Sequence, residues 1–570
     1  MRNNPLAALA VALSAAALQA QTIVPLVRQG DVIPGVGTVV DVSLVTLNAN
    51  YDWIVEVQTD NPDPDKDRVA LRMGYPFLKE GDPLAQPPGA VIKALDSYAY
   101  DWNGKLATNY TLGGAVGPND FEGLYYDGLL LAQRGAPAVS SGFSPGTTWG
   151  NFADVQLHHE QMGVYSLLVR GYVDDPAIPG TSDFYAALLF ADTAGSLLST
   201  TVIAKEGQIP PGQTDAINTI RTGSWSGRVD SGFPAPLTTQ VFWACDLNGS
   251  DLKDACVYRW SQSTGSSTLV AQEGSPSPVS GRNWGDLISP EIDVNTAGDW
   301  TLKDRLDGSS ASDGIIVKNG AKFVQEGDGH PAIAPFVFNE LGNGPAKLTA
   351  DGRILWFGGW NDSAPGAYRE ALFLDQKMLV REGQTQVNGV LLQDIEQEND
   401  SYTITADGQS VIFIGTLAGG VEGAFLLSLD GVTSYCTAKL NSQGCVPYIS
   451  WYGVPSASAP SGFKIWGKGV ISNQIGLFFY GTSGPSSAPF SGGLLCVQPP
   501  IKRLPAASSG GSGGCSGLYG LDFNTYVAQG GDPQLVAGAQ VNGQFWSRDT
   551  GLPPPFPTGL TGGIQFVLGP

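Results

Sequence analysis

Histidine is nearly absent from this chain of 570 residues, which contains three histidines and only four methionines. Active sites that need a histidine base beside a nucleophile therefore have few candidates. Charged residues are also scarce, at 15% of the chain, and acidic residues outnumber basic ones by 53 to 31. The net charge of −22 argues against nucleic acid or anionic lipid as a partner, because both would be repelled.

Long apolar runs are missing after the N-terminus, so the sequence predicts no transmembrane segment. Residues 1–20 are typical of an export signal. Arg2 supplies the positive start, Leu6 to Leu18 form an uncharged and largely apolar run, and Ala20 precedes a plausible cleavage point. We expect a protein that is secreted or associated with the cell surface.

Zinc-type cysteine spacing is absent too, since no C-x-x-C occurs among the six cysteines. An even number of cysteines at short spacings favours disulfides in an exported chain. Six cysteines allow fifteen connectivities, and proximity alone favours pairing each with its nearest neighbour. The expected pairs are Cys245 with Cys256, Cys436 with Cys445, and Cys496 with Cys515.

Glycine and proline are abundant, with 75 and 39 residues, and 42% of the chain is hydrophobic. This composition favours an all-β protein of many short strands and turns. The length exceeds what one core usually supports, so at least two domains are expected. Residues 434–570 hold six basic and three acidic residues, whereas the preceding part is strongly acidic. We therefore expect one domain over 21–433 and a second over 434–570.

A short pattern recurs seven times in the acidic part: apolar residues, a polar residue, Glu or a substitute, then Gly. The spacings between successive glycines are 51, 54, 72, 67, 53 and 56 residues. The glycines are Gly30, Gly81, Gly135, Gly207, Gly274, Gly327 and Gly383. Five of these turns contain glutamate, for which we expect a structural role, with the glycine taking a backbone angle that other residues avoid. A ring of carboxylates is the alternative.

The pattern predicts four strands in each repeat. Four antiparallel strands per repeat are typical of a propeller blade, because one such sheet cannot bury both of its faces without neighbouring sheets. The chain begins with the last strand of a unit, Thr22–Arg28, and the acidic part ends with the first three strands of another. We therefore predict a seven-bladed β-propeller closed by the N-terminal strand. An open solenoid is the alternative. In the first unit the expected strands are Val39–Leu47, Tyr51–Thr59, Arg68–Met73 and Tyr75–Lys79.

Two of the repeat segments resemble the repeats of a known group of proteins. They are Leu379-Val380-Arg381-Glu382-Gly383 and Leu78-Lys79-Glu80-Gly81-Asp82-Pro83. The acidic part resembles exported bacterial β-propeller proteins with degenerate repeats of the LVREGD type. The resemblance covers about residues 22–430 and implies fold and export, but no activity.

Residues 434–570 are rich in Gly, Ser and Pro and contain short alternating runs, which favours a small disulfide-containing β-sandwich. Two segments of this part are distinctive. They are Tyr435-Cys436-Thr437-Ala438-Lys439-Leu440-Asn441-Ser442-Gln443-Gly444-Cys445 and Phe545-Trp546-Ser547-Arg548-Asp549. They resemble a C-terminal module found at the ends of large exported bacterial proteins, which implies a general task such as surface display.

Two acidic loops suit calcium, which binds several oxygen ligands, although solvated turns are the alternative. One holds Asp246, Asn248, Asp251 and Asp254, and the other holds Asp63, Asp65 and Asp67. Calcium is the only cofactor that the sequence suggests. Trp149 and Trp284 follow the glycine turns of two units and are candidates for stacking on sugar rings, with core packing as the alternative.

No catalytic set stands out, so the main prediction is a secreted, non-catalytic binding or scaffold protein. Its propeller would recognise a glycan or a cell-surface protein. One alternative is a carbohydrate-active hydrolase or lyase that uses carboxylates in the propeller channel, since such chemistry needs no histidine. Another alternative is a structural subunit of a surface layer. The acidic residues are too many for the sequence alone to single out a catalytic pair.

Overall fold

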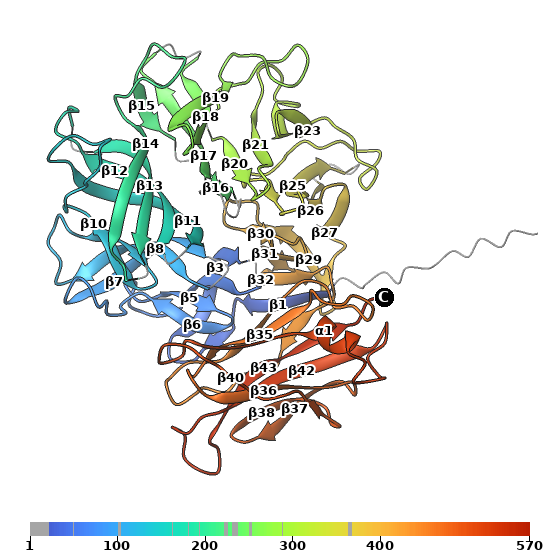
Figure 1. Cartoon of the computed structure of the whole chain (residues 1–570). Helices are drawn as coiled ribbons and strands as arrows, with labels where there is room; N and C mark the ends of the chain where they lie inside the picture. The colour runs from blue at the N-terminus through green and yellow to red at the C-terminus, as the bar shows by residue number, and fades with distance from the viewer. Residues whose placement is uncertain are drawn as a thin grey trace, which may run out of the picture.

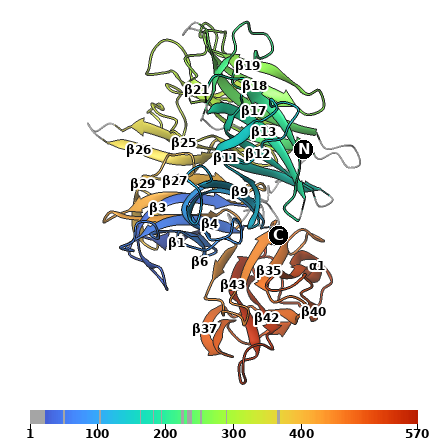
Figure 2. The same ribbon diagram turned by 90° about the vertical axis from the view of Figure 1, so that its left-hand side faces the viewer.

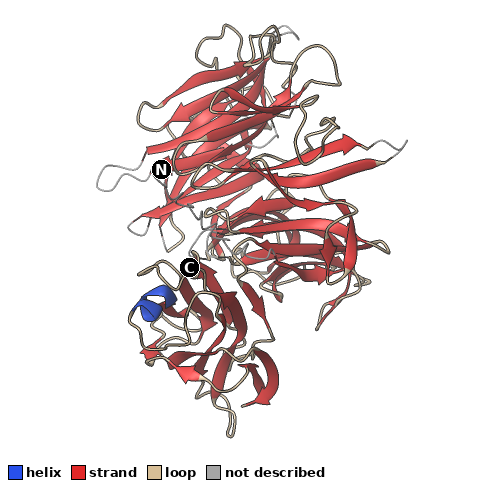
Figure 3. Ribbon diagram, turned by 90° about the vertical axis from the view of Figure 1, so that its right-hand side faces the viewer, coloured by secondary structure: helices blue, strands red, loops and turns tan. Residues whose placement is uncertain are grey.

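The computed structural model describes residues 22–48, 51–100, 104–161, 164–180, 182–192, 194–221, 226–230, 238–249, 253–287, 289–362 and 367–570. These residues form strands almost throughout, and the single helix among them is α1 (Phe523–Ala528) (Figure 3). The prediction of an all-β protein is confirmed. The predicted export signal lies outside the described residues. Within them, no helix is long and apolar enough to span a membrane.

Within residues 22–428, the described part of the chain forms seven antiparallel sheets. The first contains β2 (Val32–Ile33), β3 (Gly37–Leu47), β4 (Trp53–Thr59), β5 (Arg68–Arg72) and β6 (Tyr75–Lys79). The second contains β7 (Ala90–Tyr100), β8 (Leu106–Gly114), β9 (Glu122–Tyr126) and β10 (Leu129–Gln133). The third contains β11 (Thr148–Gln161), β12 (Val164–Asp174), β13 (Asp183–Asp192) and β14 (Leu197–Lys205). The fourth contains β15 (Ile217–Ile220), β16 (Ser226–Asp230), β17 (Thr238–Leu247), β18 (Ala255–Ser261) and β19 (Ser266–Gln272).

The remaining three sheets continue in chain order. The fifth contains β20 (Glu291–Val294), β21 (Trp300–Arg305), β22 (Gly314–Lys318) and β23 (Ala321–Gln325). The sixth contains β24 (Lys347–Leu348), β25 (Ile354–Asn361), β26 (Tyr368–Leu374) and β27 (Lys377–Arg381). The seventh contains β28 (Gln386–Val387), β29 (Val390–Ile395), β30 (Tyr402–Ile404), β31 (Ser410–Leu417) and β32 (Val421–Ser428), together with β1 (Thr22–Arg28).

The sheets succeed one another around a common centre (Figure 1). One strand of each sheet contacts its counterpart in the next, and the series closes on itself. In order, the contacts run from β3 to β7, β11, β16, β20, β24 and β30, and from β30 back to β3. The N-terminal β1 pairs antiparallel with β32, from Thr22 opposite Ser428 to Arg28 opposite Gly423. Sequence-distant ends of the acidic part thus share one sheet.

The seven repeat glycines make equivalent contacts. Each has a positive φ, between 68° and 89°, a region that glycine enters without the strain of a Cβ. Each also donates its N–H to a carbonyl of the following sheet or its lead-in, for example Gly81 to Ile92 at 2.7 Å and Gly327 to Phe338 at 2.7 Å. The preceding glutamate accepts a backbone N–H within its own sheet in three repeats: Glu80 from Arg68, Glu206 from Phe184 and Glu326 from Gly314. The repeat thus joins neighbouring sheets.

Residues 433–570 form three further sheets, which we call the C-terminal module. Their strands are β33 (Thr433–Tyr435), β34 (Tyr448–Tyr452), β35 (Lys464–Val470), β36 (Ile475–Gly481), β37 (Pro485–Phe490), β38 (Gly493–Val497), β39 (Lys502–Arg503), β40 (Ala507–Ser508), β41 (Gly517–Asp522), β42 (Gln540–Arg548) and β43 (Thr558–Val567). The largest runs β33-β43-β42-β36-β39, and a three-stranded sheet runs β34-β35-β41. The helix α1 follows β41 and is capped by the Asp522 side chain.

The predicted disulfide pairing is wrong. Cys436 is bonded to Cys496 and Cys445 to Cys515, at sequence separations of 60 and 70 residues. The long-range pairing arises because β33 leaves its chain neighbours to pair with β43, which brings Cys436 toward β38. Cys245 and Cys256 lie opposite each other on β17 and β18 but are free thiols, both buried in an apolar cluster.

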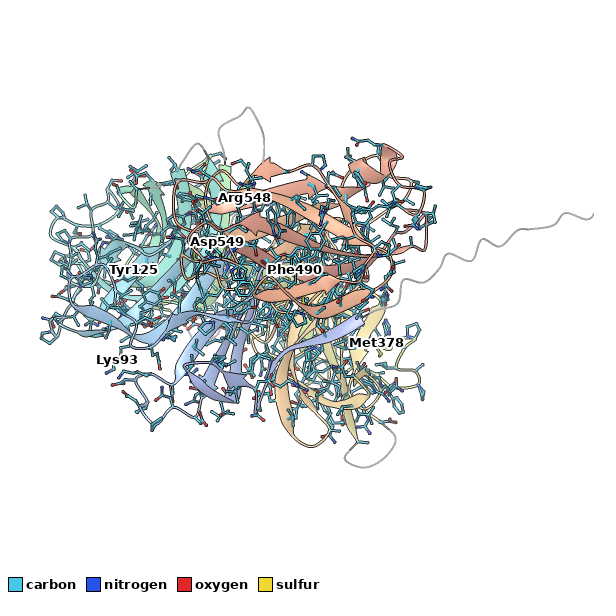
Figure 4. The ribbon with its side chains drawn as sticks, turned by 90° about the horizontal axis from the view of Figure 1, so that it is seen from below. Lys93, Tyr125, Met378, Phe490, Arg548 and Asp549 are labelled. Atoms are coloured by element: carbon cyan, nitrogen blue, oxygen red, sulfur yellow. A yellow bond between two sulfur atoms is a disulfide. The ribbon has the colours of Figure 1, made fainter. Side chains whose placement is uncertain are left out.

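The C-terminal module packs against the first sheet, on the side of the molecule where β6 lies (Figure 2). Tyr51, from the turn between β3 and β4, stacks on Trp451 of the module at 4.7 Å between ring centroids. The neighbouring Asp52 is fully buried and accepts from Lys468 at 2.9 Å. Seen from below, the module lies in front of the sheets (Figure 4). The module therefore contacts the turn between β3 and β4 of the first sheet.

Candidate active site

A cavity of 460 Å³ lies at one end of the fifth sheet. Its wall is formed by the start of β20, the end of β21, the start of β22 and the end of β23, with two loops from the following sheets. Eight charged side chains line it, six acidic and two basic. They are Asp286, Glu291, Lys303, Asp304, Arg305, Glu326, Glu340 and Glu398. We call this the acidic cavity.

The acidic cavity lies on the face away from the C-terminal module. Hydrogen bonds join the turns that follow β20, β24, β30 and β3, in that order. Asn295 Nδ2 donates to the Thr349 carbonyl, Arg353 donates to the Asp407 carbonyl, and Tyr51 Oη donates to the Asp407 side chain. Tyr51 is the residue that stacks on the module, so these turns lie at the same strand ends as the β3–β4 turn that the module contacts. The acidic cavity is built at the opposite strand ends.

Asp304, near the end of β21, is the side chain of the cavity best suited to carry a proton. It is only 9% exposed, and its Oδ2 has no hydrogen-bond partner. Its Oδ1 accepts from the Arg305 N–H at 2.7 Å. Burial raises the pKa of Asp304 to about 7, and the nearby Asp286 and Glu291 act in the same direction. A carboxyl group with these properties keeps its proton close to neutral pH.

Glu291 has a different environment in the same cavity. It stands directly opposite Lys303 in the β20–β21 ladder, and the two charges attract each other. With its amide nitrogen turned toward Glu291, Asn399 donates to Oε2 at 3.1 Å. Lys303 donates to the carbonyls of Gly342, at 2.7 Å, and Gly344. Burial lowers the pKa of Lys303 to about 8, although Glu291 favours its charged form. A cation and an amide donor therefore lie beside the Glu291 carboxyl group.

Three more carboxylates at the wall are held by neighbouring donors. Glu340 accepts from Tyr368 Oη at 2.6 Å, and Glu398 accepts from Asn343 Nδ2 at 2.9 Å. Glu326, in a repeat turn, accepts the Gly314 N–H at 2.9 Å, and burial raises its pKa to about 7. The cavity thus presents one buried acid beside several fixed acceptors, an arrangement that can bind hydroxyl groups and transfer a proton.

Those residues predicted to bind calcium that the structure describes do not form a metal-binding group. Asp246 accepts instead from Thr219 and from Arg221, at 2.9 and 2.6 Å. Asp63 pairs with Lys66 at 2.8 Å, and Asp67 accepts from Gln58 at 2.7 Å. Asp251 lies outside the described residues, while Asn248, Asp254 and Asp65 lie within them. In the described part of the chain, no three His, Cys, Asp or Glu side chains form a metal-binding group.

The two tryptophans predicted as ligand-binding residues are core residues. Trp149 is 3% exposed and packs against Phe143, Phe152 and Tyr185. Trp284 is 5% exposed in the cluster between the fourth and fifth sheets. Neither lines the acidic cavity. Both were chosen for their place after a repeat turn, and that place is where one sheet packs on the next.

Asp304 was missed from the sequence because nothing marks it among the many acidic residues. A usable signal does exist in Lys303-Asp304-Arg305, three consecutive charges that end a strand beginning with Trp300 and Leu302. Successive residues of a strand point to opposite faces, so in a strand that packs between two neighbours Lys303 and Asp304 place at least one charge toward the core or a cavity. Such a cluster therefore points to a site.

No family model and no curated protein matches the sequence. Among solved structures, the polysaccharide lyase Uly1 is similar over 70% of this chain and 91% of its own, with 10% identity and a TM-score of 0.37. The α-L-arabinofuranosidase Arb93A from Fusarium graminearum matches 60% of this chain and 94% of its own, at 10% identity and a TM-score of 0.31. An exo-β-1,3-galactanase from Phanerochaete chrysosporium matches 86% and 97%, at 13% identity and a TM-score of 0.23.

These three structures are a lyase, an arabinofuranosidase and a galactanase. All three are enzymes, so the comparisons do not support the main prediction of a non-catalytic binding or scaffold protein, which leaned against an enzyme, and that prediction is not carried further. At TM-scores of 0.23 to 0.37 the likeness carries no information on the reaction or the substrate of this chain. Only the residues of the acidic cavity bear on the reaction and the substrate of this chain.

Proposed function

We propose that the protein is an exported carbohydrate-active hydrolase and that the acidic cavity is its active site. The observation that carries the proposal is Asp304, a buried carboxyl group with a pKa near 7 and an unpartnered oxygen, in one cavity with Glu291, which stands opposite Lys303. Glycoside hydrolysis needs such an unequal pair: a protonated acid for the leaving oxygen, and a carboxylate for the sugar carbon or the attacking water.

In this proposal Asp304 protonates the glycosidic oxygen and Glu291 acts as the carboxylate. Lys303, fixed by two backbone carbonyls, supplies a positive charge beside Glu291. Glu340, Glu398 and Asn399 would bind sugar hydroxyls at the wall. No step requires a metal ion or a histidine.

The proposal includes a fold in which the seven sheets are the blades of a β-propeller and β1 completes the last blade. The closed series of contacts between inner strands, the β1–β32 pairing and the seven equivalent glycine contacts support it. Export is supported by the two disulfides of the C-terminal module, because such bonds persist in oxidising compartments.

The test is a screen of plant and algal polysaccharides for release of reducing ends by the purified full chain. Asp304→Asn and Glu291→Gln should each abolish turnover and leave the thermal unfolding temperature close to that of the wild type. Asp299→Asn, at the opposite end of the same sheet, is the matched control and should remain active. Turnover that survives in both cavity variants would contradict the proposal.

A lyase is the second candidate, and Lys303 is the observation that favours it. Its pKa near 8 makes a neutral amine accessible at mildly alkaline pH, as proton abstraction beside a uronate carboxylate requires. Unsaturated products, detected by their ultraviolet absorbance and lost in Lys303→Met, would favour this reaction over hydrolysis.

A further inference from the structure

A second cavity, of 970 Å³, lies where the C-terminal module meets the first two sheets. Its volume is typical of a ligand site. One wall comes from β34, β35 and the chain around Cys445 and Cys515, and the other from the ends of β5 and β6 with the turns of the second sheet. We call it the junction cavity. Because the chains of both walls are far apart in sequence, the cavity exists only when the module is docked.

The module's wall is one face of the sheet β34-β35-β41. Along β35, Lys464, Trp466 and Lys468 alternate with residues of the core. The strand register places Tyr452 opposite Lys464 and Tyr448 opposite Lys468. Aromatic and basic side chains thus alternate on this face, while the other face carries Ile449, Trp451 and Ile465 into the core.

Trp466 lies flat against its own sheet. Gly520 is its cross-strand partner on β41, and a Cβ at Gly520 would come within 2.9 Å of the indole Cδ1. The absence of a side chain there leaves room for the ring to lie along the backbone. The half-exposed Trp466 lines the cavity, as do Tyr452, which is 41% exposed, and Phe77 of the opposite wall, which is 39% exposed. Flat aromatic surface at a wet cavity suits the apolar faces of sugar rings.

The charge of the junction cavity is opposite to that of the whole protein. Arg72, Lys105, Lys464 and Lys468 line it, and Asp127 is the one acidic lining residue. The buried Asp52 lies behind the wall and pairs with both Lys468, at 2.9 Å, and Arg72, at 3.6 Å. Asp127 pairs with Lys105. Asp522 stands opposite Lys464 in the β35–β41 register but does not line the cavity. The lining itself therefore holds four cations and one carboxylate, on a chain of net charge −22.

We propose that the junction cavity binds a segment of an anionic polysaccharide, with Trp466 and Tyr452 stacking on sugar rings and Lys464 pairing with a carboxylate or sulfate on the sugar. Stacking alone would serve neutral sugars, but four cations gathered on an acidic protein select for negative charge. The site lies on the face opposite the acidic cavity, so it would hold a chain without competing for the reacting sugar. It does not require the hydrolase activity proposed above.

The test is isothermal titration calorimetry of the full chain with oligogalacturonate, dextran sulfate and neutral dextran. We expect binding to at least one anionic probe, weakening as salt is added, and no binding to neutral dextran. Uronate and sulfate as sources of the negative charge are distinguished by the first two probes. Trp466→Ala and Tyr452→Ala should each weaken binding by about tenfold or more, and Lys464→Ala should also reduce the salt dependence.

Lys93→Ala is the matched control for the loss of charge, because Lys93 is an exposed residue of β7 that Figure 4 shows away from the module. It should bind like the wild type. Asp304→Asn should bind normally as well, which separates this site from the proposed active site. Tyr452 is at the surface, so its variant keeps the test valid if Trp466→Ala fails to fold. Absence of binding to both anionic probes, equal binding to neutral dextran, or unchanged affinity in a folded Tyr452→Ala with Lys464→Ala would overturn the proposal.

Discussion

Asp304 gives the residue-scale prediction with the clearest pH dependence. A general acid must hold its proton, and burial raises the pKa of Asp304 to about 7. Activity, measured as kcat/KM, should therefore be constant below neutrality and fall as the pH rises through about 7. A pH–rate profile from pH 5 to 9 on any substrate found in the screen checks this. A profile that rises across neutrality would instead match a base such as Lys303.

Gly327 tests what a repeat glycine contributes to stability. Its φ is +89°, and an added Cβ would meet nothing closer than Ser312 Cβ at 3.7 Å. Gly327→Ala should therefore suffer backbone strain without a clash, and it should lose about 1–2 kcal/mol of unfolding free energy. Gly329→Ala is the control, because Gly329 is outside the positive-φ region and has similar open space. Chemical denaturation measures both, and equal stabilities would contradict this account.

At the scale of elements, the disulfides predict how the C-terminal module unfolds. Each bond closes a loop of 60 or 70 residues, so each should contribute about 4 kcal/mol through restriction of the unfolded chain. The double variant Cys445→Ser/Cys515→Ser should lower the unfolding midpoint of the module. Calorimetry with and without the substitutions checks the expected loss.

Thiol labelling provides the independent check of the connectivity. Cys245 and Cys256 are buried free thiols, so two labels should enter under denaturing conditions without reductant, and none under native conditions. Peptide mapping without reduction should recover Cys436 linked to Cys496. Recovery of a Cys436–Cys445 peptide would contradict the structure and restore the pairing by proximity.

The elements themselves were largely predictable where the repeat sets the register. In the first unit the predicted strand Tyr75–Lys79 is the observed β6, and Arg68–Met73 exceeds β5 by one residue. Alternating burial and turn residues suffice there, because each sheet is built from neighbouring segments. The helix α1 was missed, since six residues are too few to show a helical period.

The candidate site and the disulfides were not predictable in the same way. The acidic cavity combines β20 and β21 with loops at Glu340 and Glu398, so its members are more than a hundred residues apart. The pairing of Cys436 with Cys496 likewise depends on how sheets of the module pack. The local sequence pattern determines where the strands form. The burial of a carboxyl group such as Asp304 depends instead on which sheet packs beside it.

For the whole molecule, burial of carboxyl groups predicts that stability falls as pH rises. Burial raises the pKa of seven side chains to about 7 or 8, and they occur in six different sheets or their connections. They are Glu80, Glu122, Glu273, Asp304, Glu326, Glu370 and Asp430. In the unfolded chain these groups lose their protons near pH 4.

Between about pH 4 and 8 the folded state therefore binds more protons than the unfolded state, and the unfolding free energy must decrease with pH. The net charge of −22 acts in the same direction, since repulsion within the folded protein grows as these groups ionise. The unfolding temperature measured by calorimetry should be higher at pH 5 than at pH 8. Glu370→Gln, which keeps an acceptor for the Ile395 N–H but cannot ionise, should make that decrease smaller. An unfolding temperature that rises from pH 5 to 8 would show that these carboxyl groups are ionised in the folded protein, and Asp304 would then be unsuited to the role of the acid.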